Sequence, residues 1–253
     1  MLDLPDPDVD ALERSARLAA LIGSEITAAG GWLPFYRYME RALYAPGFGY
    51  YTGGAEKFGA GGDFVTAPGL TPLFGQALAA QIEEIMRASA REVLEIGAGD
   101  GHLAVDVLCE LEARDYLPQA YGILELSAEL RARQRETLFR DAPQLAARVH
   151  WLDTLPEAFS GAALANEALD AMPLHVITVK DGRVRERGVA RAAAGAPRAF
   201  VWEDRPAQGA VLEAARRLPL PMGGEGEYIT EINLAAAAWI SAWGERLRQG
   251  ALL

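Results

Sequence analysis

Three glycines spaced two residues apart follow an apolar run and an acid near the middle of the chain. Residues 93–101 read Val93-Leu94-Glu95-Ile96-Gly97-Ala98-Gly99-Asp100-Gly101, and apolar residues then recur at helical spacing up to Leu111. A strand, a glycine turn and a helix form the first unit of a nucleotide-binding α/β sheet. The glycines let the backbone approach a ligand closely, and the first amides of the helix can hold a carboxylate or phosphate.

The charge of this turn favours a cationic ligand over a dinucleotide. A dinucleotide fingerprint needs its third glycine where this chain has His102, and carboxylates at Glu95 and Asp100 would repel a pyrophosphate. S-adenosylmethionine carries a sulfonium and an ammonium group, so the acidic turn suits it better than NAD. Glycine turns also occur in ordinary loops, and an NAD-dependent oxidoreductase stays as the weaker alternative.

Polar residues also follow the next three apolar runs. They are Glu125 after 120–124, Asp153 after 148–152, and Asn166 with Glu167 after 161–165. Ligands of an open parallel sheet bind outside the carboxyl ends of its strands, so these side chains are expected to share one edge. Glu125 suits the ribose hydroxyls, Asp153 suits the exocyclic amine of the adenine, and Asn166 with Glu167 lies where the reacting groups would meet. Alone, Glu125 and Asp153 are equally explained as solvated turn residues, and Glu167 as a helix N-terminal acid.

Length and composition set the broad class of protein. The chain has 253 residues, 51% of them hydrophobic, which is enough for one large α/β domain or two modest ones. The net charge of −11 argues against a nucleic-acid groove as the main surface. One cysteine excludes a disulfide within the chain, and the three histidines share no metal-ligand spacing. The acidic start lacks targeting features and no apolar run reaches membrane-spanning length, so we expect a soluble cytoplasmic protein without a membrane span.

Periodicity and turn residues predict the elements that position these residues. Helices are expected at 9–29, 33–43, 73–88, 128–138, 211–218 and 234–248, and strands at 176–180, 183–186 and 199–202, with a hairpin at Asp181-Gly182. The region from about 175 to 230 is expected to form a small added subdomain outside the parallel sheet. The glycine-dense loop 53–64 carries aromatic residues, which favours an ordered lid or wall over the ligand. Residues 250–253 look like the opening of a fifth sheet strand.

Several separate stretches together resemble one family, the MidA-type methyltransferases, which are related to the mitochondrial complex I assembly methyltransferase. The stretches are Tyr38-Met39 to Leu43-Tyr44, Gly49-Tyr50-Tyr51, Gly62-Asp63-Phe64-Val65-Thr66-Ala67-Pro68, Phe74-Gly75, 94–101, Ala165-Asn166-Glu167-Ala168-Leu169-Asp170-Ala171-Met172-Pro173 and Glu231-Ile232-Asn233-Leu234. The resemblance covers nearly the whole chain, and the stretches 63–68 and 166–173 are far more specific than the glycine turn. It implies a class I methyltransferase fold, a Rossmann-like and mostly parallel α/β sheet, with S-adenosyl-L-methionine as cofactor. The family's best-described activity is methylation of arginine in a protein of the respiratory NADH dehydrogenase.

The resemblance also implies a division of the chain and a set of site residues. We expect an N-terminal helical cap with a glycine-rich lid over 1–90 and the cofactor-binding domain over 91–253, with the insertion at about 175–230. The predicted cofactor-binding residues are Glu95, Gly97, Gly99, Gly101, Glu125, Leu152, Asp153, Thr66 and Pro68, and the predicted catalytic residues are Asn166, Glu167 and Asp170. No metal is expected. A carboxylate at Glu167 would orient a substrate guanidinium by charge-assisted hydrogen bonds.

Two departures from the family pattern favour a second hypothesis. Gly69 stands where the family usually has a glutamate, which removes a carboxylate from the expected substrate side. Family members also continue beyond this C-terminus, so we expect a member truncated at strand 5 with an unpaired sheet edge. Both departures are compatible with a non-catalytic cofactor-binding or assembly module instead of an active enzyme.

Overall fold

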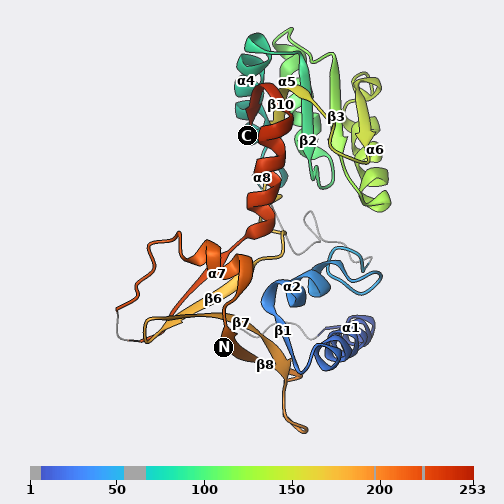
Figure 1. Ribbon diagram of the computed structural model, residues 1–253. Coiled ribbons are helices and arrows are strands. Elements are labelled where there is room, and N and C mark those ends of the chain that lie inside the picture. The colour runs from blue at the N-terminus through green and yellow to red at the C-terminus, as the bar shows by residue number, and fades with distance from the viewer. Residues whose placement is uncertain (1–6, 54–66, 197, 224–225) are drawn as a thin grey trace. The chain divides into compact units, whose positions relative to one another are not determined.

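The computed structural model describes residues 7–53, 67–196, 198–223 and 226–253 (Figure 1). Contacts group the chain into two compact units, one from 56–170 and 239–253 and the other from 1–55 and 171–238. Each unit holds a five-stranded sheet, parallel in the first and antiparallel in the second. We call them the parallel-sheet unit and the antiparallel-sheet unit.

The parallel-sheet unit alternates short apolar strands with helices. Its strand order is β10-β5-β2-β3-β4, with β2 at Glu92–Ile96, β3 at Ala120–Leu124, β4 at Val149–Leu152, β5 at Phe159–Leu164 and β10 at Leu247–Leu252. The helices of this unit include α4 (Leu73–Ala88), α5 (His102–Ala113) and α6 (Ala128–Asp141), and a short 3-10 turn (Ala146–Arg148) precedes β4. The order reverses at β2, which pairs with β3 on one side and β5 on the other, so a ligand site is expected at its carboxyl end.

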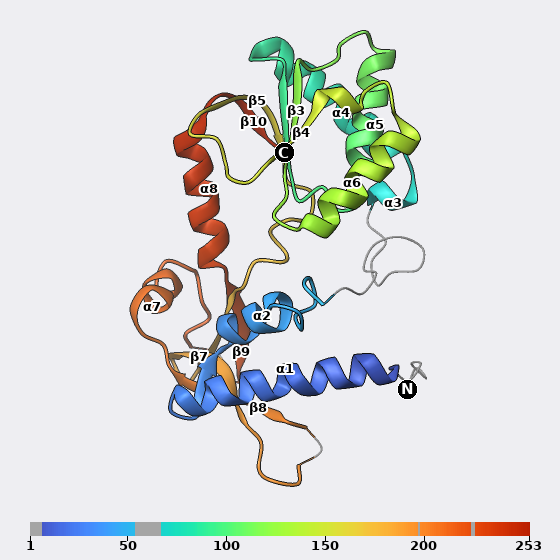
Figure 2. The same cartoon turned by 90° about the vertical axis from the view of Figure 1, so that its right-hand side faces the viewer.

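Both faces of the parallel sheet are packed with apolar side chains. On one face Val93 and Tyr121 belong to a buried cluster that includes Ile82 of α4 and Leu108 of α5. The other face packs Leu94 and Ala163 against Trp243 of α8 (Leu234–Arg246), whose C-terminal half lies along this sheet (Figure 2). Burial on both faces explains why these strands are continuous apolar runs.

The antiparallel-sheet unit joins the start of the chain to the inserted region. Its strands are β1 (Trp32–Pro34), β6 (His175–Lys180), β7 (Arg183–Arg191), β8 (Phe200–Pro206) and β9 (Tyr228–Ile232), in the order β1-β7-β6-β9 with β8 also paired to β7. Helix α7 (Gly209–Ala215) packs on Ile177 and Ile232. Helices α1 (Val9–Ala28) and α2 (Phe35–Tyr44) pack around Leu33 and Val189.

The structure corrects some of the element boundaries expected from sequence. Residues 32–34 form a strand rather than the start of a helix, because Leu33 pairs with Val189 of β7 and is buried there. The hairpin at Asp181-Gly182 is confirmed, and the strand expected at 250–253 is present but begins at Leu247.

The grouping of contacts also differs from the division expected at residue 90. Helices α1 and α2 pack with the antiparallel sheet, whereas α3 (Ala67–Leu70) and α4 pack against α5 in the parallel-sheet unit. The expected lid over 53–64 lies, apart from Gly53, outside the described residues. None of the described helices is long and apolar enough to cross a membrane.

Candidate cofactor site

The glycine turn joins β2 to α5 through backbone that only glycine adopts easily. Gly97, Gly99 and Gly101 have φ values of 70°, 56° and 90°, all in the left-handed region. A Cβ built on Gly101 would lie 3.1 Å from the Cα of Gln134, whereas one on Gly99 would meet nothing within 4 Å. Both the left-handed backbone and the tight packing favour glycine at position 101, whereas Gly99 borders open space. Asp100 accepts a hydrogen bond from the backbone N–H of His102 (3.3 Å), which stabilises the start of α5.

Glu95 is a buried carboxyl group directly before this turn. Tyr121 of β3 donates from its hydroxyl to Oε2 of Glu95 at 2.7 Å. Burial raises the pKa of Glu95 to about 7, the hydrogen bond from Tyr121 opposes that rise, and the nearby charge of Asp100 adds to it. A cation beside the turn would lower the pKa of Glu95 and favour its ionised form. Binding of a cationic ligand would therefore increase the negative charge on Glu95.

Glu125 follows β3 and is held by a network around Gln134 of α6. Its Oε1 accepts from the backbone N–H of Ser127 at 2.9 Å, and its Oε2 accepts from Nε2 of Gln134 at 3.3 Å. Gln134 is 0% exposed, donates also to the carbonyl oxygen of Gly99 (3.0 Å), and accepts at Oε1 from Nε1 of Trp151 (2.8 Å). One side chain thus joins the glycine turn, the acid after β3 and strand β4. Both oxygens of Glu125 keep lone pairs for further donors such as ribose hydroxyls.

Asp153 lies at the same edge, after β4, but its side chain is 86% exposed. Arg131 of α6 holds it, since Nη2 donates to Oδ1 of Asp153 and to the carbonyl oxygen of Leu152, both at 2.7 Å. Nε of Arg131 donates to the carbonyl oxygen of Glu125 at 2.5 Å. Arg131 therefore fixes the chain ends of β3 and β4 relative to each other.

The turn after β5 carries the predicted catalytic residues. Asn166 is half-buried, while Glu167 and Asp170 are exposed. Glu167 has a φ of 52°, an uncommon backbone for a residue with a side chain and one that often occurs at functional turns. No helix begins at this turn, so the alternative interpretation of Glu167 as a helix N-terminal acid is wrong. The turn lies next to the glycines, because a Cβ on Gly97 would be 3.8 Å from the Cβ of Ala168.

The remaining predicted residues lie on the segment before α4. Pro68 is half-buried on α3, which packs against α4 and α5, and Gly69 is exposed on the same short helix. Thr66 lies outside the described residues. The part of the chain that the structure describes holds no group of three or more His, Cys, Asp or Glu suited to a metal ion.

Sequence reasoning missed the residues that connect this site. Gln134, Trp151 and Arg131 were not predicted, and neither was the bond from Tyr121 to Glu95. Gln134 did carry a signal, because it stands between Leu130 and Leu138 at helical spacing, a polar residue within an apolar stripe. A buried polar side chain at such a position must find hydrogen-bond partners, and here they belong to the site.

A parallel sheet whose order reverses at a glycine turn, with acids at the carboxyl ends of its strands, defines a nucleotide-binding α/β fold. Residues 73–253 match the family of S-adenosyl-L-methionine-dependent methyltransferases. This chain belongs to that family, and its resemblance to the MidA type is confirmed. The residues fit the family's cofactor: the turn has open space at Gly99, a buried acid beside it and an acceptor at Glu125.

Individual relatives agree with this assignment. The mitochondrial protein arginine methyltransferase NDUFAF7 homolog of Drosophila melanogaster is 29% identical over 207 residues, 72% of this chain and 46% of that protein. Its counterpart in Danio rerio is 31% identical over 180 residues, 61% of this chain and 42% of that protein. The chain thus spans about half the length of the curated relatives it matches.

A solved structure confirms the fold class. A protein from Burkholderia thailandensis that was solved bound to S-adenosyl-homocysteine is 50% identical, with a TM-score of 0.90 over 99% of this chain and 64% of that chain. The expected class I methyltransferase fold is therefore correct. The comparisons do not favour an NAD-dependent oxidoreductase.

Proposed function

We propose that this chain binds S-adenosyl-L-methionine at the carboxyl edge of its parallel sheet and transfers the methyl group to an arginine side chain of a protein. One observation carries the cofactor part: Gln134 ties the glycine turn at Gly99 and the carboxylate of Glu125 into a single hydrogen-bonded unit. A turn and an acid held in fixed relation suit a ligand with a charged end and a ribose.

Each predicted residue has a role in this proposal. Gly97, Gly99 and Gly101 hold the methionine end, and the charge of Glu95 favours the cationic groups there. Glu125 accepts hydrogen bonds from the ribose hydroxyls, since both of its oxygens keep free lone pairs. Leu152 and Asp153 lie where β4 ends and contact the adenine. Thr66 and Pro68 stay predicted contributors from the segment before α4.

The chain's contribution to transfer is positioning and electrostatics. When bound, the cofactor supplies a methyl group on a sulfonium centre. Glu167 and Asp170 are exposed carboxylates that can hold a guanidinium by charge-assisted hydrogen bonds, and Asn166 offers an amide beside them. A carboxylate there also accepts the proton that the guanidinium nitrogen gives up on methylation. Positioning of this kind accounts for a large part of the rate of such a displacement.

The choice of arginine and of a protein substrate rests on the relatives' names and on charge. The curated relatives are named protein arginine methyltransferases, and a net charge of −11 suits a basic partner. A subunit of a respiratory NADH dehydrogenase is the substrate that the family resemblance suggests. A cytoplasmic location stays a prediction.

The test separates cofactor binding from transfer. Titration calorimetry with S-adenosyl-L-methionine is expected to show binding, and radiolabelled cofactor is expected to label an arginine-containing protein. The Glu167→Gln variant should keep cofactor affinity and lose most transfer, whereas Glu157→Gln, an exposed acid elsewhere in the same unit, should change neither. Binding without any transfer would leave the alternative of a non-catalytic module, and absence of binding would reject the proposal altogether.

A further inference from the structure

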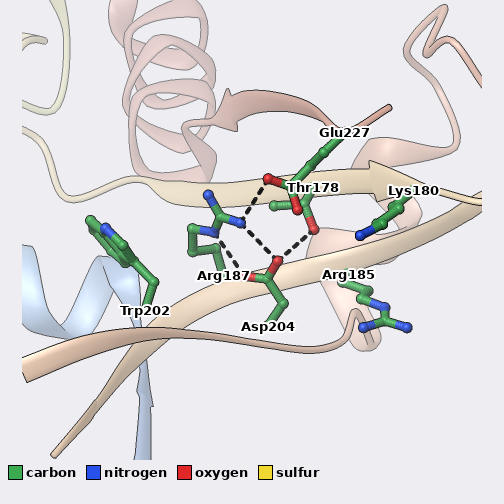
Figure 3. A pocket seen from close by; sticks show the side chains of 7 residues that line it. All are labelled: Thr178, Lys180, Arg185, Arg187, Trp202, Asp204 and Glu227. Atoms are coloured by element: carbon green, nitrogen blue, oxygen red, sulfur yellow. Dashed lines mark hydrogen bonds and ion pairs between the residues drawn. The ribbon is translucent and has the colours of Figure 1, made fainter. Parts of the chain in front are cut away.

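One face of the antiparallel sheet carries a hollow of about 300 Å³ near the β6–β7 hairpin (Figure 3). Its lining side chains are Thr178, Lys180, Arg185, Arg187, Trp202, Asp204 and Glu227. Helix α7 packs on Ile177, whose side chain points to the opposite face from its neighbour Thr178. On the face of the hollow, α1 and α2 pack around Leu33 and Val189 at the other end of β7. The hollow therefore opens on the part of the sheet that these helices leave uncovered.

The floor of the hollow is a fixed network of charges. Arg187 of β7 donates from Nε and Nη2 to the two carboxylate oxygens of Asp204 on β8, at 2.8 and 2.9 Å, and Nη2 also reaches Glu227 at 3.2 Å. Thr178, which is 0% exposed, donates from its hydroxyl to Asp204 at 3.0 Å. The bond to Arg187 lowers the pKa of Asp204, and the bond to Thr178 lowers it further. These groups are already satisfied by one another.

Two cations beside this network make no ion pair within the described part of the chain, although the charge of Arg185 also lowers the pKa of Asp204. Among the described residues neither Lys180 nor Arg185 makes an ion pair, and Figure 3 shows both side chains on the same side of the hollow. The sheet also sets like charges opposite each other, because Lys180 pairs in register with Arg183 while Arg185 follows on the same face. Like charges in such cross-strand positions repel and destabilise the sheet. A bound anion between Lys180 and Arg185 would offset the positive charge gathered on this face of the hairpin.

The rest of the lining points to a polypeptide as the source of the anion. Trp202 is 59% exposed at the border of the hollow, with its ring 5.5 Å from that of Phe35. An exposed aromatic ring offers an apolar surface of the kind that anchors peptides. The carboxylates of Asp204 and Glu227 in the same hollow would lie against the successive charges of a phosphate backbone, whereas a peptide can present a single carboxylate to Lys180 and Arg185. Mixed charges around one aromatic suit an acidic peptide better than a nucleic acid.

We propose that this hollow docks an acidic segment of the protein substrate, with a carboxylate held between Lys180 and Arg185 and an apolar side chain against Trp202. The proposal deepens the proposed methyl transfer and rests on it for the identity of the ligand as a substrate. The docking surface is built from residues of the antiparallel-sheet unit, whereas the predicted cofactor residues belong to the other unit. The two sites can therefore be tested separately.

Fluorescence anisotropy with a labelled peptide that carries both glutamate and leucine side chains tests the docking of the carboxylate and of the apolar group. We expect the 253-residue chain to bind this peptide, and the double variant Lys180→Glu with Arg185→Glu to bind it at least about tenfold more weakly. A factor of ten corresponds to about 1.4 kcal/mol, which is less than two charge-assisted hydrogen bonds contribute. Affinity should also fall as salt is added. The control is Arg198→Glu with Arg217→Glu, two exposed arginines of the same unit that do not line the hollow and that change the net charge equally.

Folding checks and competing ligands are needed to interpret a loss of peptide binding. Thermal melting and titration with S-adenosyl-L-methionine check that the charge-reversed variant is folded. If that variant is unfolded, the single variant Arg185→Gln is used instead, and a smaller loss of peptide affinity is expected. Inorganic phosphate or a short DNA duplex competing as well as the peptide would overturn the proposal in favour of a general anion site. Equal binding by the reversed and control variants, or no peptide binding, would overturn it too. If the unaltered chain binds the peptide but does not bind S-adenosyl-L-methionine, the docking proposal stands and the proposed function is contradicted.

Discussion

The two sheets of this chain differ in how their polar side chains are held. At the parallel sheet the polar groups are buried and joined: Gln134 satisfies Gly99 and Glu125, and Tyr121 satisfies Glu95. At the antiparallel sheet a part-buried network joins Arg187, Asp204 and Thr178, whereas the exposed Lys180 beside it makes no ion pair among the described residues.

The difference matches the ligands proposed for each. A small ligand of fixed shape is best held by backbone and side chains that packing has already oriented, because little ordering is then left for binding to do. A peptide of varied sequence needs long side chains that adjust to it, and such chains stay exposed. The first kind of site should lose affinity steeply when its packing is disturbed, and the second should respond mainly to charge.

Replacing Gly101 by valine should have the largest effect. The left-handed backbone costs a branched residue about 1–3 kcal/mol, and crowding against the Cα of Gln134 adds about 1–3 kcal/mol. We expect affinity for S-adenosyl-L-methionine to fall by about a hundredfold in titration calorimetry. Gly195→Val is the control, since Gly195 is also left-handed at φ 83° but has nothing within 4 Å and lies in the antiparallel-sheet unit. An equal loss of cofactor affinity in both variants would contradict the importance of packing between the glycine turn and Gln134.

Replacing Gln134 by leucine should have the next largest effect. Leucine keeps the bulk of the side chain but leaves the carbonyl of Gly99, Oε2 of Glu125 and Nε1 of Trp151 without their partner. Each unsatisfied group costs about 1–3 kcal/mol, so cofactor affinity should drop about tenfold and the melting temperature should fall. Gln144→Leu is the control, because the side chain of Gln144 makes an exposed hydrogen bond to Glu112, at the surface of the same unit. Unchanged cofactor affinity in Gln134→Leu would show that the network is structural and separate from the site.

The placement of the glycine turn and of the acids at the strand ends could be predicted from sequence. The turn at Gly97–Gly101 and the acid Glu125 follow from residue types at short spacing, and the structure places them at one sheet edge. The role of Gln134 did not follow, because its partners come from three other segments that only the fold brings together. Residues 33–34 were misassigned to a helix for the same reason, since pairing with β7 overrides their local pattern. The hollow at Lys180 did not follow from sequence either, because Trp202 and Asp204 of β8 line it only through the pairing of β8 with β7.

The raised pKa of Glu95 gives a smaller effect that depends on pH. Its pKa lies at about 7 in the folded chain and is ordinarily 4.5. Below pH 7 the carboxyl group is protonated and no longer favours a cation, so affinity for S-adenosyl-L-methionine should fall several-fold from pH 8 to pH 6. The Glu95→Gln variant should bind weakly with no such dependence. A wild-type affinity that is constant over this range would contradict the role given to Glu95.

Stability without ligand should change with pH in the opposite direction. Between about 4.5 and about 7 the folded chain binds the proton of Glu95 more tightly than the unfolded chain does. The free energy of unfolding therefore decreases as the pH rises through this window. The Glu95→Gln variant should melt at a temperature that changes less over the same window.

The smallest expected effect concerns Thr178, which lies under the hollow of the antiparallel sheet. Valine in its place keeps the shape but removes the hydroxyl that donates to Asp204, a bond of the kind that contributes about 1 kcal/mol. We expect a melting temperature lower by about 2–4 °C and no change in affinity for S-adenosyl-L-methionine. Thr230→Val on β9 is the control, because the hydroxyl of Thr230 makes no hydrogen bond to the described part of the chain. If Thr178→Val weakened cofactor binding as Gln134→Leu is expected to, the two sheets would be energetically coupled, and the contrast between a preorganised site and an independent docking surface would no longer hold.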